Sequence, residues 1–342
     1  MGYGGGEGGA GTQHPPVDRP RAARPEEIPA IIALCDAAFR GPPYTTSMGE
    51  DFPRLFSAAN AADLRVIAGP DGDILAHAGL LRGRVLLDGI QVPAAAMGAV
   101  VTRADVRGRG LGTAVVQDAM RRLATDGVAI LTISGDRSLY LRAGAAPAGC
   151  CWRWHLAPSG GDPALRLRPP ADLHELAGLH AKEPVRWLRD LGAFAAHGYA
   201  RSIHCRQSAW VVEAGSRAVA YWVVGVPDRG RRPRDTGYVI EFAGERDALA
   251  VTMNALCRQL GVRALTLFTA ERDWVAGARP ELRPLPGTVA VLRPDVLAMA
   301  AGWPLPTGPD LVAAFFGRAG QLRDPALPPP LHLPWPNGLD YV

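Results

Sequence analysis

The chain has 342 residues, of which 48% are hydrophobic and 20% charged, so its composition is that of a globular protein with room for about two domains. No stretch reaches the roughly 18 apolar residues of a membrane helix, and the N-terminal segment lacks the basic and apolar regions of a secretory signal. We therefore expect a cytoplasmic protein without membrane contact. The net charge is +4, but Lys182 is the only lysine and arginine accompanies much glycine and proline, so we expect no nucleic-acid partner.

The first half of the chain predicts a mixed α/β domain over residues 18–157, after a glycine-rich tail at 1–17 that we expect to be disordered. Apolar residues at helical spacing predict a helix over 25–40. Turn signals at 70–72 and 88–89 separate strand-like segments. The other expected elements are a short helix within 47–59, strands at 64–69, 74–87 and 90–102, a helix ending at 126, a strand at 128–134, a short helix at 137–144 and a strand at 150–157.

The order of elements partly recurs in the second half, over residues 169–283, after a linker at 158–168 that is rich in proline and glycine. The expected elements are a helix at 171–182, strands at 209–215, 218–226 and 237–244, a helix at 245–261 and a strand at 263–269. We therefore expect an α/β (α+β) protein with two copies of one fold, each a mixed, mostly antiparallel sheet flanked by helices. The proline-rich segment 284–342 is expected to pack onto these domains.

A glycine-rich turn with two arginines lies between the strand at 90–102 and the helix after it, and reads Arg107-Gly108-Arg109-Gly110-Leu111-Gly112. A helix N-terminus offers unpaired N–H groups and a positive dipole end, glycines let a phosphate approach, and arginines add charge. The turn therefore predicts a pyrophosphate site, and a turn that only permits tight strand–helix packing is the alternative. The second half has Glu245-Arg246-Asp247 at this place, so we expect the second copy to have lost the site.

Arg107-x-x-Gly110-x-Gly112, after a strand and at the start of a helix, resembles the acyl-CoA signature of the GNAT N-acetyltransferases, with Ala104 where that signature commonly has proline. The resemblance covers about residues 18–157. The tandem arrangement and the segment Ser134–Gly144 are similar to the enhanced intracellular survival acetyltransferases of actinobacteria, in which a degenerate second domain follows an active one. Mycothiol synthase also has two such domains, which keeps thiol biosynthesis open.

The resemblance implies a role for each matched residue. Backbone groups of Ala99, Val100 and Val101 would pair with the pantetheine arm of acetyl-CoA. The pyrophosphate would be held at Arg107, Gly108, Arg109, Gly110, Leu111, Gly112 and Thr113, and Asp136 is assigned to the same coenzyme site. Tyr140 would protonate the departing thiolate, for which a phenol with a pKa of about 10 is suited. A packing aromatic on an amphipathic helix is the alternative for Tyr140.

The sequence does not single out the base that must deprotonate the attacking ammonium group. The strand at 90–102 has no carboxylate, although many relatives place a glutamate there. The candidates are Glu50, Asp51, Asp136 and the C-terminal carboxylate of Val342, which the resemblance to the survival acetyltransferases implies. We expect Asp136 to cap the short helix and Glu50 and Asp51 to be solvated. A water relay would need no single base, and His77 and His155 are expected to be core or surface residues.

The sequence thus predicts an N-acetyltransferase that uses acetyl-CoA as co-substrate and needs no metal. The acetyl group would pass to a primary amine by direct attack in a ternary complex. The acceptor would be a small molecule or a peptide amine. The sequence leaves the oligomeric state open, including a homo-oligomer. A non-catalytic acyl-CoA-binding or regulatory protein of the same fold is the alternative, and acetylation of nucleic acid ranks below both.

Overall fold

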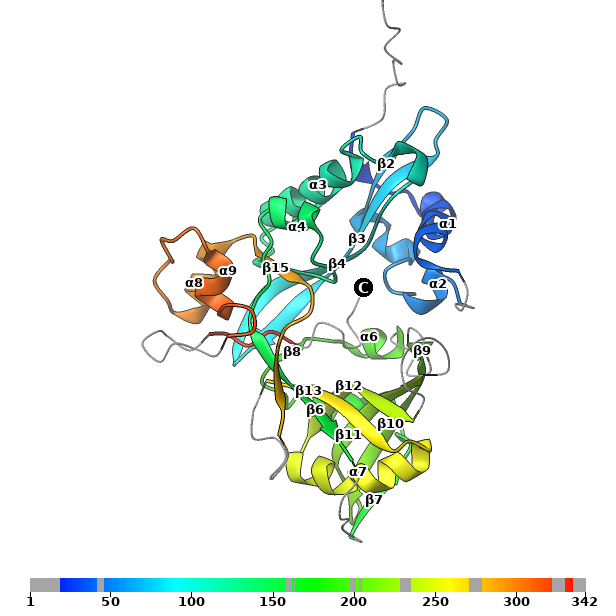
Figure 1. Cartoon of the computed structure of the whole chain (residues 1–342), viewed down its shortest axis with the longest axis vertical. Coiled ribbons are helices and arrows are strands. Elements are labelled where there is room, and N and C mark those ends of the chain that lie inside the picture. The colour runs from blue at the N-terminus through cyan, green and yellow to red at the C-terminus, as the bar shows by residue number, and fades with distance from the viewer. Residues whose placement is uncertain are drawn as a thin grey trace, which may run out of the picture.

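The computed structural model describes residues 19–41, 46–157, 162, 164–196, 201–202, 205–227, 235–270, 279–321 and 330–334. Within these residues the chain forms two mixed sheets, each with helices packed on both faces (Figure 1). The expected fold class, two mostly antiparallel mixed sheets flanked by helices, is confirmed. None of the helices in these ranges is long and apolar enough to cross a membrane.

The first sheet has seven strands, and its central strands match the predicted boundaries. They are β1 (Arg21–Ala22), β2 (Leu64–Ala68), β3 (Ile74–Leu87), β4 (Ile90–Thr102), β5 (Ile130–Ile133) and β15 (Thr288–Val291), in this order, with β8 (Arg186–Trp187) paired to β3. Asp88 and Gly89 join β3 to β4 with φ of +50° and +89°, the left-handed pair that a two-residue hairpin favours. Among the strand pairs of this sheet that the structure describes, β4 and β5 are the one parallel pair.

Helices cover both faces of the first sheet, because the central stretches of β2, β3 and β4 are buried at successive residues and so on both faces. On one face lies α3 (Leu111–Thr125), which buries Leu111, Val115, Val116, Ala119, Met120 and Leu123 at helical spacing. On the other face lie α1 (Ile28–Phe39) and α2 (Met48–Asp51), with the short 3₁₀ segments η1 (Pro25–Glu27) and η2 (Ala58–Asp63). The elements η3 (Ala104–Val106) and α4 (Ser138–Arg142) complete this domain, next to the start of α3 and the end of β5.

The second sheet has eight strands and repeats the order of strand, strand, strand, helix, strand. In order across the sheet they are β14 (Glu281–Pro284), β6 (Cys150–Leu156), β13 (Ala264–Thr269), β12 (Thr236–Gly244), β11 (Arg217–Pro227), β10 (Cys205–Ala214) and β7 (Leu165–Arg168), with β9 (Arg201–Ser202) paired to β10. Helix α7 (Arg246–Leu260) packs on one face, and α5 (Leu173–His180) and α6 (Leu191–Ala196) pack on the other. Of the described pairs in this sheet, β12 and β13 alone are parallel, as β4 and β5 are in the first sheet.

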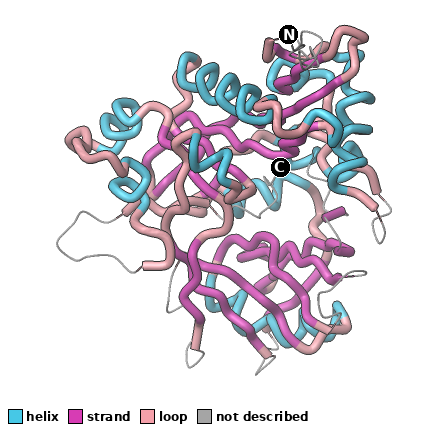
Figure 2. The backbone as a smooth tube through the Cα atoms, turned by 45° about the horizontal axis from the view of Figure 1, so that its top comes forward, coloured by secondary structure: helices cyan, strands magenta, loops and turns pink. Residues whose placement is uncertain are grey.

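Several strands pair across the expected domain boundaries, among them β8, which lies in the range 169–283 but pairs with β3 of the first sheet. β6 pairs with β13 and β14 in the second sheet, whereas its sequence position led us to expect it in the first domain. In exchange, β15 from the proline-rich segment pairs with β5 at the edge of the first sheet. Gly287 (φ +82°) permits this approach, because a Cβ atom there would collide with the carbonyl oxygen of Ile133. Figure 2 shows the two sheets as separate sets of strands.

Other segments also differ from the expected boundaries. β7 lies within the range 158–168 that we expected to be a linker, and its residues pair with β10. The proline-rich segment contributes α8 (Pro294–Ala301) and α9 (Leu311–Phe316), which cover apolar residues near the turn of the β3–β4 hairpin. The glycine-rich tail at 1–17 lies outside the described residues.

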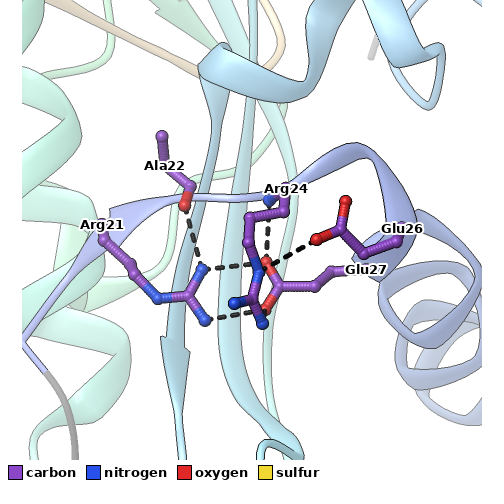
Figure 3. A network of polar contacts seen from close by, with 5 residues as sticks. All are labelled: Arg21, Ala22, Arg24, Glu26 and Glu27. Carbon is purple, nitrogen blue, oxygen red and sulfur yellow. Dashed lines mark hydrogen bonds and ion pairs between the residues drawn. The ribbon is translucent and has the colours of Figure 1, made fainter.

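A buried carboxylate fixes the start of α1 (Figure 3). Glu27 accepts hydrogen bonds from both Nη atoms of Arg21, at 2.8 and 2.7 Å, and from the backbone N–H of Arg24 at 2.8 Å. The hydrogen bond from Arg21 is the main reason that the pKa of Glu27 falls to about 2. Since Arg21 lies on β1, these contacts join the first helix to the edge of the sheet.

Candidate functional site

The glycine turn places the start of α3 directly beside the end of β4. Gly108 and Gly110 have φ of +80° and +79°, which favour glycine, and a Cβ atom on either would meet open space. At Gly112, by contrast, a Cβ atom would lie 2.9 Å from Oγ1 of Thr102 on β4. Two glycines therefore shape the turn, and the third allows the helix to approach the strand closely.

The turn leaves N–H groups and guanidinium groups available to an anion. The first hydrogen bond of α3 runs from the N–H of Ala114 to the carbonyl of Gly110 at 2.9 Å, so the N–H groups of residues 111–113 have no acceptor within the helix. Arg107 is exposed and Arg109 half-buried, and neither forms an ion pair with a carboxylate in the described part of the chain. Arg103 differs, because it binds Asp105 at 2.7 Å and Asp73 at 3.1 Å. Arg107 donates through Nε to the carbonyl of Thr102 at 3.2 Å. Arg103, with a smaller contribution from Arg109, lowers the pKa of Asp105. The turn thus combines backbone N–H groups that are unused within the helix with two arginines that form no ion pair among the described residues.

β4 separates from β5 just before this turn. The two strands pair only from Ala94–Ile130 to Met97–Ile133, while β4 continues to Thr102. No strand in the described ranges pairs with that edge of β4 beyond Met97. The edge carries the predicted pantetheine contacts Ala99, Val100 and Val101, so these residues lie next to a gap in the sheet that an extended chain of amides can enter.

A β-bulge lies at the same place. Against β3 the register shifts between His77 and Gly79, so that Ala99 and Val100 face the single residue Ala78. Ala99 has a φ of +50°, which costs a residue other than glycine about 1–2 kcal/mol. Its carbonyl oxygen accepts a hydrogen bond from Nδ1 of His77 at 2.9 Å. Sequence reasoning treated His77 as a core or surface histidine, since no local pattern announces this contact.

Tyr140 lies on α4, which follows β5, and is 6% exposed. It belongs to the same apolar cluster as Val100 and Ile133, the residues at the mouth of the strand separation. A Cβ atom on Gly135 would lie 3.1 Å from Cε2 of the ring, so Gly135 lets the ring lie against the backbone. The structure thus places Tyr140 on the α3 side of the sheet, close to the end of β5.

Two of the candidate bases, Asp51 and Asp136, have surroundings that differ from the expected ones. Asp51 is not solvated, because it binds Arg40 at 2.6 Å and its side chain is 4% exposed. Glu50 is solvent-facing and accepts a hydrogen bond from the N–H of Ser47 at 3.2 Å, in a capping box. Asp136 is exposed and does not cap α4, whose N-cap residue is Arg137 without a side-chain cap. Val342 lies outside the described residues.

The second domain keeps the strand separation but not the turn. β12 and β13 pair only from Thr236–Ala264 to Tyr238–Thr266, and β12 also has a register shift against β11. Eight residues, 103–110, lie between β4 and α3, whereas only Glu245 lies between β12 and α7. A connection of one residue is too short to form a turn that presents several backbone N–H groups to an anion. This geometry agrees with the expected loss of the site.

A cavity of about 1390 Å³ lies between the domains and does not coincide with this site. Among its walls are Trp152, Glu183, Trp187, Glu241 and Trp303, together with both sides of the β12–β13 separation. The residues described as lining it include neither the glycine turn nor Tyr140. The two strand separations therefore open onto different surroundings.

A known protein family matches the sequence of the first domain. Residues 19–148 match the family model described as acetyltransferase (GNAT) domain, which confirms the resemblance seen in the sequence. A GCN5-related N-acetyltransferase from Anabaena variabilis is similar in structure, with a TM-score of 0.63 and 13% identity over 81% of this chain and 73% of that one. No curated protein sequence matches the chain.

Two further solved structures extend the similarity. Eis1 from Mycobacterium abscessus aligns with a TM-score of 0.54 and 16% identity over 80% of this chain and 74% of that one. N-myristoyltransferase from Saccharomyces cerevisiae with bound myristoyl-CoA aligns with a TM-score of 0.50 and 11% identity over 81% and 80%. Because each alignment spans about four fifths of this chain, the shared fold includes both sheets.

Proposed function

We propose that this protein is an N-acetyltransferase that takes acetyl-CoA as co-substrate and acetylates a primary amine. The observation that carries this proposal is the first-domain turn, where helix N–H groups without an acceptor and the arginines Arg107 and Arg109 follow a strand that has separated from its neighbour. The GNAT family match over residues 19–148 supports acyl transfer as the reaction. The second domain lacks the turn, so one coenzyme is expected per chain.

The coenzyme would bind to backbone more than to side chains. Its diphosphate would accept hydrogen bonds from N–H groups of residues 108–113 and pair with Arg107 and Arg109, as anions do at helix starts. Its pantetheine amides would add to the free edge of β4 at Ala99, Val100 and Val101, in the manner of an added strand. The exposed Asp136 would not pair with the diphosphate, because two anions repel. Since it precedes α4, we place it near the thiol end of the coenzyme, beside Tyr140.

The reaction needs one proton removed and one delivered. A neutral amine attacks the thioester carbonyl, a C–N bond forms, and the C–S bond of the tetrahedral intermediate breaks to release the thiolate of CoA. In our proposal the phenol of Tyr140 protonates that thiolate and is reprotonated from solvent. The ammonium proton leaves through a water relay or to the Val342 carboxylate. Asp51 is a poor base because Arg40 already binds it.

Coenzyme binding can be tested through the two arginines. In isothermal titration with acetyl-CoA, we expect one site per chain and a loss of affinity on the order of 100-fold in R107A/R109A. Arg103 is the matched control, because it is a neighbouring arginine already paired with Asp105 and Asp73. An R103A protein that loses as much affinity as the double variant, or a wild type that releases no heat, would contradict the proposal.

The alternative is a binding module that holds acyl-CoA without turnover. The engagement of Asp51 with Arg40 and the lack of a carboxylate on β4 are the observations that favour it. Thiol release from acetyl-CoA separates the two functions, measured with polyamines, aminoglycosides and lysine peptides as acceptors. Acceptor-dependent thiol release establishes the transferase, and tight binding with no release on any acceptor supports the module.

A further inference from the structure

His77 lies on β3, beneath the bulge of β4, and is completely buried. Its Nδ1 is 2.9 Å from the carbonyl oxygen of Ala99, the residue with the left-handed backbone. A carbonyl oxygen only accepts hydrogen bonds, so Nδ1 carries the proton and donates it. This contact selects the tautomer in which Nε2 is unprotonated, and Nε2 has no hydrogen-bond partner among the described atoms.

The surroundings keep His77 neutral. Burial lowers the pKa of its imidazole to about 4, which the hydrogen bond to Ala99 only partly offsets. Cys35 on α1 lies beside it, with Sγ 3.8 Å from Nδ1 and 3.9 Å from the Ala99 oxygen. Burial raises the pKa of the Cys35 thiol to about 12, so it too is uncharged. The Ala99 carbonyl is therefore held by neutral groups in the apolar core under α1.

The orientation of this one peptide group affects the edge of β4. In a trans peptide the C=O and the following N–H point in opposite directions, so fixing the Ala99 carbonyl also fixes the Val100 N–H. Ala99, Val100 and Val101 form the part of β4 that has no partner from β5. Without His77 the buried carbonyl would keep only the weak thiol donor of Cys35, which would favour rotation of this peptide, because alanine does not prefer a φ of +50°.

We propose that His77 is a positioning residue, whose Nδ1–H holds the Ala99 carbonyl and thereby orients the edge groups of Ala99–Val101 that receive the pantetheine arm of CoA. The inference rests on the proposed function, because it takes CoA as the ligand. It adds that the pantetheine half of the site depends on a side chain from β3, whereas the diphosphate half does not. A histidine that only fills the core would affect both halves alike.

The two halves of the coenzyme provide the test. Binding of CoA is compared with binding of adenosine 3′-phosphate 5′-diphosphate, the part of CoA that lacks the pantetheine arm. The variants are His77→Leu, which keeps a similar apolar bulk without a donor, and His77→Asn, whose amide nitrogen can take the place of Nδ1. We expect His77→Leu to bind CoA on the order of tenfold more weakly and the fragment unchanged, with His77→Asn closer to the wild type.

The outcomes distinguish this inference from the proposed function. If the wild type binds neither ligand, the proposed function is wrong. If the wild type binds both and His77→Leu binds CoA as the wild type does, or loses both ligands equally, His77 does not position the β4 edge. The inference is equally overturned if His77→Asn is as impaired for CoA as His77→Leu.

A measurement on the unmodified chain covers the case in which His77→Leu does not fold. In ¹⁵N-labelled protein, NMR shows which ring nitrogen of each histidine is protonated. We expect His77 to be protonated at Nδ1 only, unchanged between pH 6 and pH 8, since burial lowers its pKa to about 4. Protonation at Nε2 in the absence of ligand would overturn the inference, because Nδ1 could then not donate to Ala99.

Discussion

Glu183 binds Arg246 at the start of α7, with Oε2 of the carboxylate 2.6 Å from Nη2 of the guanidinium group. The other carboxylate oxygen, Oε1, accepts a hydrogen bond from the N–H of Gly244 at 2.8 Å. A carboxylate of the chain itself thus lies at the helix start that corresponds to the glycine turn of the first domain. The second copy therefore has an internal ion pair where the first domain has its exposed glycine turn.

Replacing Glu183 is expected to destabilise the second domain. In E183Q the charge pair with Arg246 is lost while the shape is kept, and since the two side chains are only 13% and 30% exposed, we expect a loss of about 1–2 kcal/mol in the free energy of unfolding. Urea unfolding measures it. The matched control is E245Q, which breaks the exposed Arg217–Glu245 pair and should change stability by less than about 0.5 kcal/mol. Equal stability of E183Q and the wild type would contradict the expectation.

The carboxylate of Glu27 is expected to make stability depend on pH. Its pKa falls from about 4.5 to about 2 on folding, chiefly through Arg21, so its contribution is complete above pH 4.5 and is lost as the pH falls toward 2. We expect E27Q to be about 2 kcal/mol less stable than the wild type at pH 7, and the difference to shrink over that acid range. Urea unfolding at several pH values tests this. E26Q removes the charge of the neighbouring Glu26, whose side chain is 69% exposed, and should show no such dependence on pH.

Local signals in the sequence predicted the strands and turns of the first domain well. The boundaries of β3 and β4 match because Asp88-Gly89 is a strong two-residue hairpin signal between alternating apolar segments. The start of α3 followed from the glycines, whose left-handed φ values are a property of the turn alone. These features depend on neighbours in the sequence, so sequence reasoning can reach them.

Contacts between distant residues were not predictable in the same way. β6 and β15 are ordinary short strands, and nothing within them specifies that each pairs with the other domain's sheet. Asp51 looked solvated because its partner, Arg40, is eleven residues away on another helix end. The hydrogen bond from His77 to Ala99 depends on a bulge that appears only once β3 and β4 pair. Register and side-chain pairing set these contacts, and neither leaves a local pattern.

Gly112 provides a test of close packing at the glycine turn. Alanine at this position places a Cβ atom 2.9 Å from Oγ1 of Thr102, so we expect G112A to shift the start of α3, to lose about 1–2 kcal/mol of stability and to bind acetyl-CoA roughly tenfold more weakly. The double variant T102A/G112A removes the clashing oxygen and should recover both properties. G110A should not respond to T102A, because its defect is the φ of +79°. Recovery of G110A by T102A, or no recovery of G112A, would contradict this division of roles.

Tyr140 is expected to act on the chemical step and not on coenzyme binding. Phenylalanine keeps the ring against Gly135 and removes only the hydroxyl group, so Y140F should bind acetyl-CoA with unchanged affinity. If the phenol protonates the thiolate, the rate of acceptor-dependent thiol release should fall on the order of 100-fold or more. Calorimetry and a thiol assay measure the two quantities, and L141A, at a neighbouring side chain that is 45% exposed, serves as the control. A Y140F protein that retains the wild-type rate would show that Tyr140 only packs, because packing is all that the substitution preserves.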